Sequence, residues 1–304
     1  MKTINKPYLA VFLQVIIIGF SFIFVKFALK YLKVLDIMTY RFFLASISVI
    51  IFNLFSKDKI KIKIKEFIKI LPLAILFPVL VFTSQAYGLL YQSASQAGII
   101  SALGPIFTLV FQVVILKEKT NIKQNIMIFI SILGLIYMTL KGNKSDHTFS
   151  LIGAFYIFFS TICMSLYIVL VRKYTKIYSY KDITYIVIVV GFIILLIINI
   201  LANNGIGNFI GGFHNFKNKE FLLAIVYLGV FSSFITSILN NYALSFFKAS
   251  KVAAITNLSP IVTVLAGVFI LGESLKIYHV IGILMSLIGI IGINIFKDKK
   301  DQPF

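Results

Sequence analysis

The sequence has few of the groups on which enzyme, metal and redox chemistry depend. It contains one cysteine, Cys163, so no disulfide can form within the chain. It has no HExxH zinc motif, no nucleophile elbow and no phosphate-binding loop. Its 10 acidic residues avoid the middle of the long hydrophobic runs, where a proton relay would need them. We therefore expect no catalytic residue, no metal site and no cofactor, and proton-relay chemistry is disfavoured.

Hydrophobic residues dominate the composition. They make up 60% of the chain, the mean hydropathy is +1.00, and only 13% of residues are charged. A soluble domain has about 45–50% apolar residues, and a membrane-spanning helix needs about 20 of them in succession. We predict an all-α integral membrane protein with ten transmembrane helices. The predicted spans are Leu9–Leu29, Leu35–Phe55, Ile70–Tyr91, Ala97–Leu116, Gln124–Leu140, Ser150–Val171, Ile183–Ala202, Phe221–Phe247, Val252–Gly272 and Ile277–Phe296.

The basic residues predict the orientation of the chain. The net charge is +19, with 29 Lys and Arg residues. If the N-terminus is inside, twenty of these lie in the termini and cytoplasmic loops, against seven in the outer loops. The positive-inside rule then places both termini in the cytoplasm, in the inner (cell) membrane. The first span lacks an A-x-A-like cleavage site, so we expect it to be retained rather than removed as a signal peptide. We attribute the basic charge to topology and to anionic inner-leaflet lipids, not to nucleic acid.

One stretch of the chain occurs twice. Residues Tyr87–Glu118 align with Tyr242–Glu273 at a fixed offset of 155, without a gap, and thirteen of the 32 positions are identical. We infer a duplication that divides the chain into a first repeat (1–142), an outer linker (143–149) and a second repeat (150–304). Five spans per repeat is an odd number, so the second repeat enters the membrane from the opposite side. Such inverted repeats are typical of secondary transporters, whose substrate site lies where the halves meet.

The duplicated stretch also carries a family resemblance. Each copy has a helix with a proline, a threonine three positions later, and a glutamate at its far end. The copies read SALGPIFT at 101–108 with Glu118, and TNLSPIVT at 256–263 with Glu273. This pattern resembles the duplicated EamA-like domain of the drug/metabolite transporter superfamily, and the resemblance covers residues 9–296. It implies a ten-helix inner-membrane carrier that moves a small metabolite by alternating access.

Two prolines are candidate hinges. Pro105 and Pro260 are expected in the middle of the fourth and ninth spans. Proline donates no hydrogen bond, so each frees a carbonyl four residues earlier, at Ser101 and Thr256. Both residues also carry a hydroxyl group, which would give each repeat a polar position near mid-bilayer. The alternative is a kink that only shapes helix packing.

Polar residues on the third and eighth spans are candidate substrate ligands. At the offset of 155, Gln85 aligns with Asn240, and Tyr87 aligns with Tyr242. An amide in hydrocarbon is costly unless it has a partner, so these side chains should face the bundle interior or a wet cavity. The alternative is inter-helix hydrogen bonding that only holds the bundle together. The predicted substrate-binding residues are Gln85, Tyr87, Ser101, Asn240, Tyr242, Thr256, Thr236, Ser21 and Ser165.

Charged residues at span ends are candidate gates. Lys26 and Arg41 are the only basic residues within spans, and we expect both to extend to the outer interface. Arg172 matches Lys26 at an offset of 146. We predict one gating ion pair on each face, Lys26 with Glu273 outside and Arg172 with Glu118 inside.

Three functional hypotheses follow. The first is a secondary carrier or exporter of small zwitterionic or neutral metabolites such as amino acids, whose partners are that substrate and the bilayer. The second is a membrane enzyme acting on lipid-linked substrates, which would need paired carboxylates or histidines that the sequence does not bring together. The third is a membrane protein that binds a small molecule or a partner without transporting it.

Overall fold

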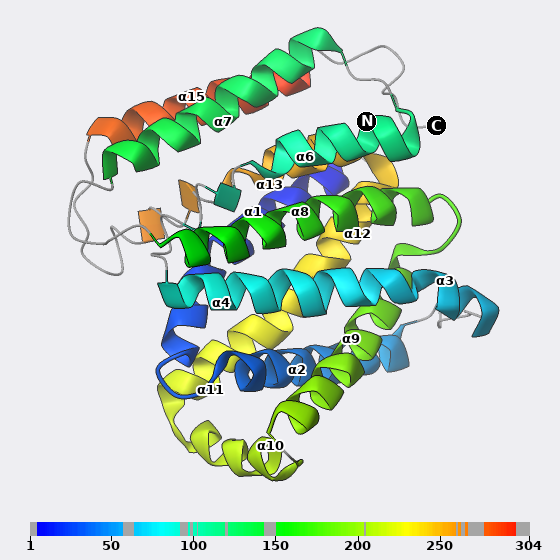
Figure 1. Cartoon of the computed structure of the whole chain (residues 1–304). Helices are drawn as coiled ribbons and strands as arrows, with labels where there is room; N and C mark the ends of the chain where they lie inside the picture. Colours follow the sequence, from blue (N-terminus) through cyan, green and yellow to red (C-terminus); the bar gives the residue numbers. More distant parts are fainter. Residues whose placement is uncertain are drawn as a thin grey trace.

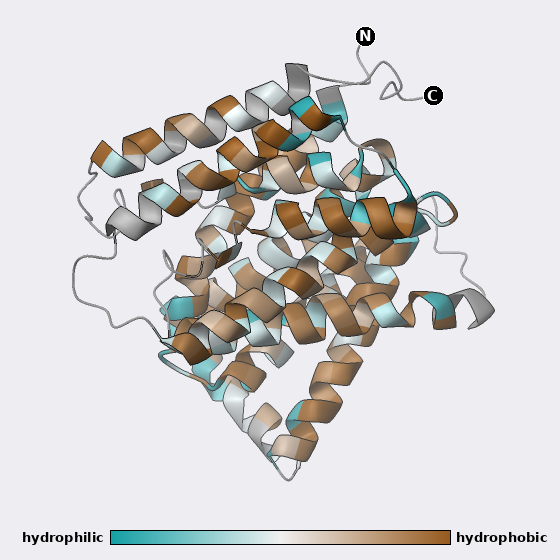
Figure 2. Ribbon diagram, turned by 45° about the horizontal axis from the view of Figure 1, so that its top comes forward, coloured by the Kyte–Doolittle hydropathy of each residue, from teal (hydrophilic) through white to brown (hydrophobic). Residues whose placement is uncertain are grey.

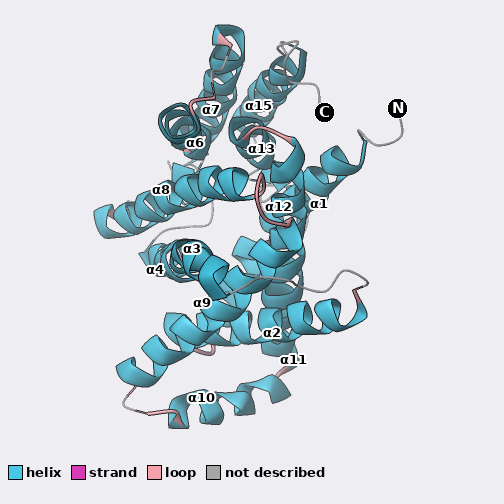
Figure 3. Ribbon diagram, turned by 90° about the vertical axis from the view of Figure 1, so that its right-hand side faces the viewer, coloured by secondary structure: helices cyan, strands magenta, loops and turns pink. Residues whose placement is uncertain are grey.

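The computed structural model of this chain is helical. It describes residues 5–56, 64–91, 97, 100–101, 103–118, 121–142, 150–203, 205–259, 261–262, 265–266 and 277–295. Every regular element within these ranges is a helix (Figure 3). This agrees with the physics of a bilayer, where backbone groups must be hydrogen-bonded within the protein and a helix achieves this within one segment.

The helices follow the two repeats predicted from the sequence. The first repeat contains α1 (Asn5–Ala28), α2 (Val34–Phe55), α3 (Ile64–Ala74), η1 (Ile75–Phe82), α4 (Thr83–Tyr91), α6 (Gly104–Phe111), η2 (Gln112–Leu116) and α7 (Ile122–Gly142). The second contains α8 (Leu151–Tyr174), α9 (Tyr180–Ala202), α10 (Gly207–Gly211), η3 (Gly212–Lys217), α11 (Lys219–Val226), η4 (Tyr227–Ile235), α12 (Thr236–Phe246), α13 (Ala249–Thr256) and α15 (Ile277–Ile295). The segments η1, η2 and η4 are π-helical, and η3 is a 3₁₀ helix.

Six helical stretches are long and apolar enough to cross a bilayer. They are Lys6–Ala28, Val34–Phe55, Ile68–Tyr91, Leu151–Tyr174, Tyr180–Ala202 and Lys219–Phe246. The other four predicted spans overlap α6 with η2, α7, α13 and α15. They include the shorter apolar stretches Gly104–Leu116 and Asn125–Gly134, and part of the ninth predicted span, Val252–Gly272, lies outside the described residues. Large apolar side chains such as Leu54, Phe155 and Leu223 are exposed on the helices, and hydrophobic residues colour most of the ribbon (Figure 2). These side chains are suited to contact lipid.

The helix contacts agree with a two-fold relation between the repeats. Helix α7 packs along α15, α2 against α9, and α6 against α13, so corresponding spans of the two repeats meet each other (Figure 1). The other contacts come in exchanged pairs: α1 packs on α12 and η4, and its counterpart α8 packs on α4 and η1. Likewise α2 contacts η4, and α9 contacts η1. The two repeats are therefore interleaved rather than stacked as separate halves.

Glycines allow a close approach of the helices α7 and α15. A Cβ atom on Gly289 would lie 2.6 Å from the carbonyl oxygen of Met127 and 2.6 Å from the Cβ of Ser131. A Cβ on Gly292 would overlap the Met127 side chain. Small residues at a helix contact let two backbones approach closely in a membrane, where van der Waals packing drives association.

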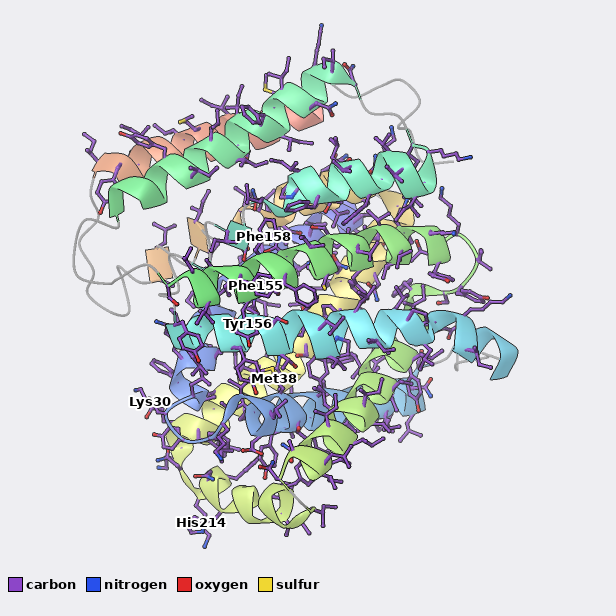
Figure 4. All side chains as sticks on the ribbon, in the orientation of Figure 1. Lys30, Met38, Phe155, Tyr156, Phe158 and His214 are labelled. Atoms are coloured by element: carbon purple, nitrogen blue, oxygen red, sulfur yellow. The ribbon has the colours of Figure 1, made fainter. Side chains whose placement is uncertain are left out.

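The segment between α9 and α11 folds onto α2 through aromatic contacts. The Tyr40 hydroxyl donates a hydrogen bond to the carbonyl oxygen of Phe209, and the two rings stack with centroids 5.0 Å apart. Phe213 and Phe216 pack edge-on against Tyr40, at 5.2 and 5.3 Å. His214 is exposed and points away from the body of the protein (Figure 4). The short helices α10 and η3 are thereby held against the N-terminal half of α2.

Candidate functional site

The fourth span of each repeat is interrupted at the same place. In the first repeat the amide of Leu103 donates to the carbonyl of Ile100 at 3.2 Å; in the second, Leu258 donates to Ile255 at 3.0 Å. These pairs are related by the offset of 155 found in the sequence. Both bonds reach back three residues rather than the four of an α-helix, so a tight turn separates two helical pieces in each repeat. Discontinuous helices of this kind form substrate sites in many secondary transporters.

The structure corrects the predicted position of Pro105. Pro105 lies in the first turn of α6, which begins at Gly104, and not in the interior of an uninterrupted helix. The physical reason is that the first turn needs no amide donor from proline, whose fixed φ angle suits a helix start. The Ser165 hydroxyl of α8 donates to the Gly104 carbonyl at 3.0 Å and to the Thr161 carbonyl at 2.8 Å. Pro260 lies outside the described residues.

The hydroxyl residues beside the two interruptions are only partly buried. Ser101 and Thr256 both have intermediate exposure, and the Thr256 Oγ1 atom has no hydrogen-bond partner among the described residues. Ser21 and Thr236 instead bond back to their own helices, to the carbonyls of Ile18 at 2.8 Å and Ser232 at 2.6 Å. The Thr256 hydroxyl oxygen is thus buried and unpaired among the described residues, although the residue as a whole is partly exposed.

A π-helical segment lies in the third span of both repeats. Segment η1 (Ile75–Phe82) and segment η4 (Tyr227–Ile235) overlap when 155 is added to the first. A π-helix widens the turn and is frequently found at functional sites. Its presence in both copies indicates that the widening belongs to the repeat itself.

Arg41 lies between these two π segments, and its position overturns the expectation that it extends to the outer interface. Its side chain is 1% exposed. The Nε atom donates to the Ser233 hydroxyl at 2.7 Å, and Nη2 donates to the Ser232 hydroxyl at 3.0 Å, both in η4. The Cζ atom lies 3.8 Å from the ring centroid of Phe82, at the end of η1. The physical reason is that these polar and aromatic partners, contributed by both repeats, replace the water that extension would reach.

A second set of buried polar side chains forms a hydrogen-bond network that joins four helices. The Gln14 amide of α1 donates to the Asn240 oxygen at 3.2 Å, and Asn240 donates to the Asn241 oxygen at 3.3 Å. Asn241 in turn donates to the Thr184 hydroxyl of α9 at 2.9 Å and accepts from Tyr167 of α8 at 3.4 Å. All five side chains are at most 3% exposed. Asn240 is thus a bridging residue of the bundle in this conformation.

The aligned partners of the third and eighth spans have different surroundings. Gln85 is half-buried, whereas Asn240 is buried in the network described above. Tyr87 stacks on Tyr156 of α8 with centroids 5.7 Å apart. Tyr242 packs edge-on against Tyr180 at 5.3 Å. The duplication therefore preserves the residue types without reproducing their contacts.

A cluster of charges lies where η2, α8 and α12 end. The Glu118 carboxylate lies 3.8 Å from Arg172 Nε and accepts a hydrogen bond from Lys176 at 3.0 Å. Arg172 also donates to the carbonyls of Leu244 at 2.8 Å and Ser245 at 3.1 Å, at the end of α12. The cluster thus connects η2 of the first repeat with α8 and α12 of the second.

The residue before Glu118, Lys117, has a left-handed backbone conformation that turns the chain toward this cluster. Lys117 has a φ angle of 53°, the one positive φ of a non-glycine residue in the described ranges. The corresponding residue of the second copy is Gly272, whose structure lies outside the described residues. Glycine is the usual residue for such a helix end, so lysine here carries a conformational cost.

A second ion pair joins the loop after α1 to the first turn of α11. Lys30 lies 3.2 Å from Glu220, which also accepts a hydrogen bond from the Tyr31 hydroxyl at 2.6 Å. That hydrogen bond to Glu220 raises the pKa of Tyr31. Glu273, the predicted partner of Lys26, lies outside the described residues.

In the described part of the chain, no three His, Cys, Asp or Glu side chains gather where a metal ion could be held.

Comparison with known proteins settles the family. The family model of EamA-like transporters matches the chain twice, over residues 5–140 and 151–295. The chain belongs to the EamA-like transporter family. It is therefore a multi-pass membrane protein of a transporter family, built from two EamA repeats.

Similar proteins extend along the whole chain. The "Uncharacterized transporter YcxC" of Bacillus subtilis (strain 168) is 40% identical over 298 residues, which are 98% of this chain and 96% of that protein. The "Uncharacterized transporter YyaM" of the same organism is 26% identical, over 90% of this chain and 88% of that protein. A solved crystal structure aligns with a TM-score of 0.72 at 11% identity, covering 97% of this chain and 99% of that one. At that identity the similarity shows the fold alone.

Proposed function

We propose that this EamA-like protein is a secondary transporter that moves a small metabolite such as an amino acid out of the cell by alternating access. The observation that carries the proposal is the paired interruption of the fourth spans, at Ile100–Leu103 and Ile255–Leu258. Because the repeats are inverted, an interrupted helix in each repeat lets the bundle bend at two equivalent positions. One repeat can bend to open the inner side and the other to open the outer side.

The inner charge cluster supports a gate on the cytoplasmic side. Glu118 at the end of η2 and Arg172 at the end of α8 belong to different repeats, so opening between these elements must separate them. Both side chains are 16% exposed, so the pair is partly shielded from water. We expect it to favour the inward-closed state modestly, because partly exposed ion pairs contribute about 0–1 kcal/mol. On the outer face, the Lys26–Glu273 pair remains a prediction.

Substrate contacts are proposed for residues beside the interruptions and on the third span. Ser101 and Thr256 are partly exposed residues, and the Thr256 hydroxyl oxygen is buried without a partner among the described residues, so it would become available to a polar group when the bundle opens. Gln85 and Tyr87 are half-buried on α4, which packs against α8 of the other repeat. A path between α4 and α8 would expose them to a substrate near the meeting of the repeats.

Transport in a defined system tests the proposal. The purified protein is reconstituted in liposomes loaded with one unlabelled amino acid at a time, and uptake of the same labelled amino acid is measured. A carrier exchanges the two, so at least one amino acid should accumulate above the level in protein-free liposomes. The absence of such exchange for the full set of twenty amino acids would refute the proposed substrate class.

Two proline substitutions, one a test and the other its control, examine the role of the interruption. Pro105→Ala restores a backbone donor at the start of α6 and allows the fourth span to close into a continuous helix. We expect exchange to slow several-fold while thermal stability is kept or raised. The matched control is Pro72→Ala, because Pro72 also lies inside a helix but is exposed on α3. Equal slowing by both changes would remove the special role of the interruption.

A further inference from the structure

The guanidinium of Arg41 is buried without an opposite charge. Glu118 and Glu220 form ion pairs in the described ranges, and neither pairs with Arg41. Its hydrogen-bond partners are two neutral hydroxyls, Ser232 and Ser233. Arginine keeps its proton in proteins, so a full positive charge lies at a position that is 1% exposed. A buried charge that lacks a counter-charge is costly, and an ionisable residue inside a membrane bundle is a functional-site candidate by default.

The second repeat provides an internal control for a purely structural role. At the offset of 146 the counterpart of Arg41 is Val187, and at the offset of 155 the counterparts of Ser232 and Ser233 are Phe77 and Pro78. These three residues are buried, and α9 packs on η1 as α2 packs on η4. The same helix contact is thus made with apolar side chains in one repeat and with Arg–Ser–Ser in the other. The fold does not require the charged set.

The chemistry of the charged set matches one kind of ligand. A guanidinium presents its donors as a planar fork that fits the two oxygens of a carboxylate. Each serine hydroxyl that now accepts from Arg41 also has a proton of its own to donate to an anion. The set lies between η1 and η4, where the two repeats meet, which is the location of substrate sites in inverted-repeat transporters.

We propose that Arg41, together with Ser232 and Ser233, binds the carboxylate of the transported molecule. The substrate class is then small organic acids and amino acids that carry a free carboxylate. In the conformation described here the two serine hydroxyls accept the hydrogen bonds of the Arg41 guanidinium. The substrate carboxylate replaces or joins them when the path between the repeats opens. This inference rests on the proposed transport function and specifies its substrate class.

Ligand-induced thermal stabilisation in detergent tests the assignment without any need for flux. The probes are the twenty amino acids and acetate, each paired with its amide, so that only the carboxylate is changed. We expect at least one carboxylate to stabilise the wild-type protein, with a half-saturating concentration roughly 10- to 100-fold lower than that of its amide. Arg41→Gln should raise that concentration by a similar factor. Arg41→Lys keeps the charge but loses the fork, so its effect should be intermediate.

The matched control is Lys217→Gln, which removes one positive charge from the exposed surface of η3. It should leave the half-saturating concentration of the carboxylate unchanged. Equal stabilisation of the wild type by every carboxylate and its amide would overturn the assignment. So would an Arg41→Gln variant that binds the carboxylate as tightly as the wild type does.

Chemical accessibility of arginine provides a second measurement on the unmodified protein, in case Arg41→Gln does not fold. The chain has only two arginines, Arg41 and Arg172. Phenylglyoxal treatment in nanodiscs, followed by peptide mass spectrometry, should label the partly exposed Arg172 quickly and Arg41 slowly. A stabilising carboxylate should slow labelling of Arg41 further. Failure of Arg41 to react after Arg172 is fully modified would contradict a path that opens onto it.

These measurements separate the two proposals. Carboxylate binding that depends on Arg41, in a protein that shows no exchange in liposomes, keeps the inference and refutes the carrier function. Exchange that proceeds in Arg41→Gln with an unchanged half-saturating concentration keeps the carrier and refutes the inference.

Discussion

Replacement of Asn240 by leucine probes the buried amide network most directly. The Asn240 oxygen accepts from Gln14 at 3.2 Å, and its amide donates to Asn241 at 3.3 Å, with Asn240 only 3% exposed. Asn240→Leu leaves the Gln14 amide without its acceptor, whereas Asn241 keeps Tyr167 as a donor. A buried unsatisfied donor costs about 1–3 kcal/mol, and inter-helix hydrogen bonds in membranes average about 0.6 kcal/mol. We therefore expect a loss of about 1–2 kcal/mol in unfolding free energy.

The assay is reversible unfolding in mixed micelles with increasing SDS. Gln85→Leu is the matched control, because Gln85 aligns with Asn240 in the duplication but is only half-buried, and it should change stability little. The double variant Gln14→Leu/Asn240→Leu removes both partners, and such paired removal can be nearly neutral. It should therefore recover much of the loss. A double variant that loses as much as the sum of the single variants would refute this account of the network.

Four further outcomes follow from the packing and the charges. Reporter fusions at Phe304 and within Asn203–Glu220 should report the cytoplasm and the outside respectively, and an outer C-terminus would contradict the predicted topology. Exchange in liposomes should proceed without a pH gradient, because no carboxylate is expected at mid-bilayer; strict dependence on the gradient would contradict this. Gly191→Ala should destabilise the fold by about 1–3 kcal/mol in the same unfolding assay, because the new methyl group would overlap the Pro78 ring of η1. Lys117→Gly should raise unfolding free energy by about 0.5–1 kcal/mol, since glycine adopts the left-handed conformation without strain; unchanged stability would show that Lys117 is not strained.

Hydropathy and duplication were sufficient to predict the helical membrane fold and its two repeats. Both signals are properties of long segments, so errors at single residues do not matter. Pro105 lies next to the interruption of the fourth span, but the sequence could not reveal that it starts a new helix. That outcome depends on the turn at Leu103 and on the hydroxyl that Ser165 supplies from another helix.

Arg41 shows why the candidate site could not be completed from the sequence. Near the predicted outer end of α2, a long basic side chain could extend to water or turn inward. The choice depends on Ser232 and Ser233, which lie more than 190 residues later and reach Arg41 only when the repeats interleave. A usable signal was present, because the aligned position in the second repeat is Val187, and an arginine that has no charged counterpart in a duplication suggests a specific role.

Gln14 was missed for a different reason. It is a lone amide in the apolar first span, with nothing in the duplication to draw attention to it. The cost of an unpartnered amide in hydrocarbon was the available clue. It predicts that Gln14 must have a partner, and the structure supplies Asn240 from a helix 226 residues away in the sequence.

The pairing of α7 with α15 has a consequence for biosynthesis. Helix α7 is complete at Gly142, but its partner ends at Ile295, so 153 residues must still be translated before the two can pack. At a synthesis rate of about 5–20 residues per second, α7 waits in the bilayer for roughly 8–30 seconds without the glycine face of α15. The first repeat therefore cannot reach its final packing while it is the only part made.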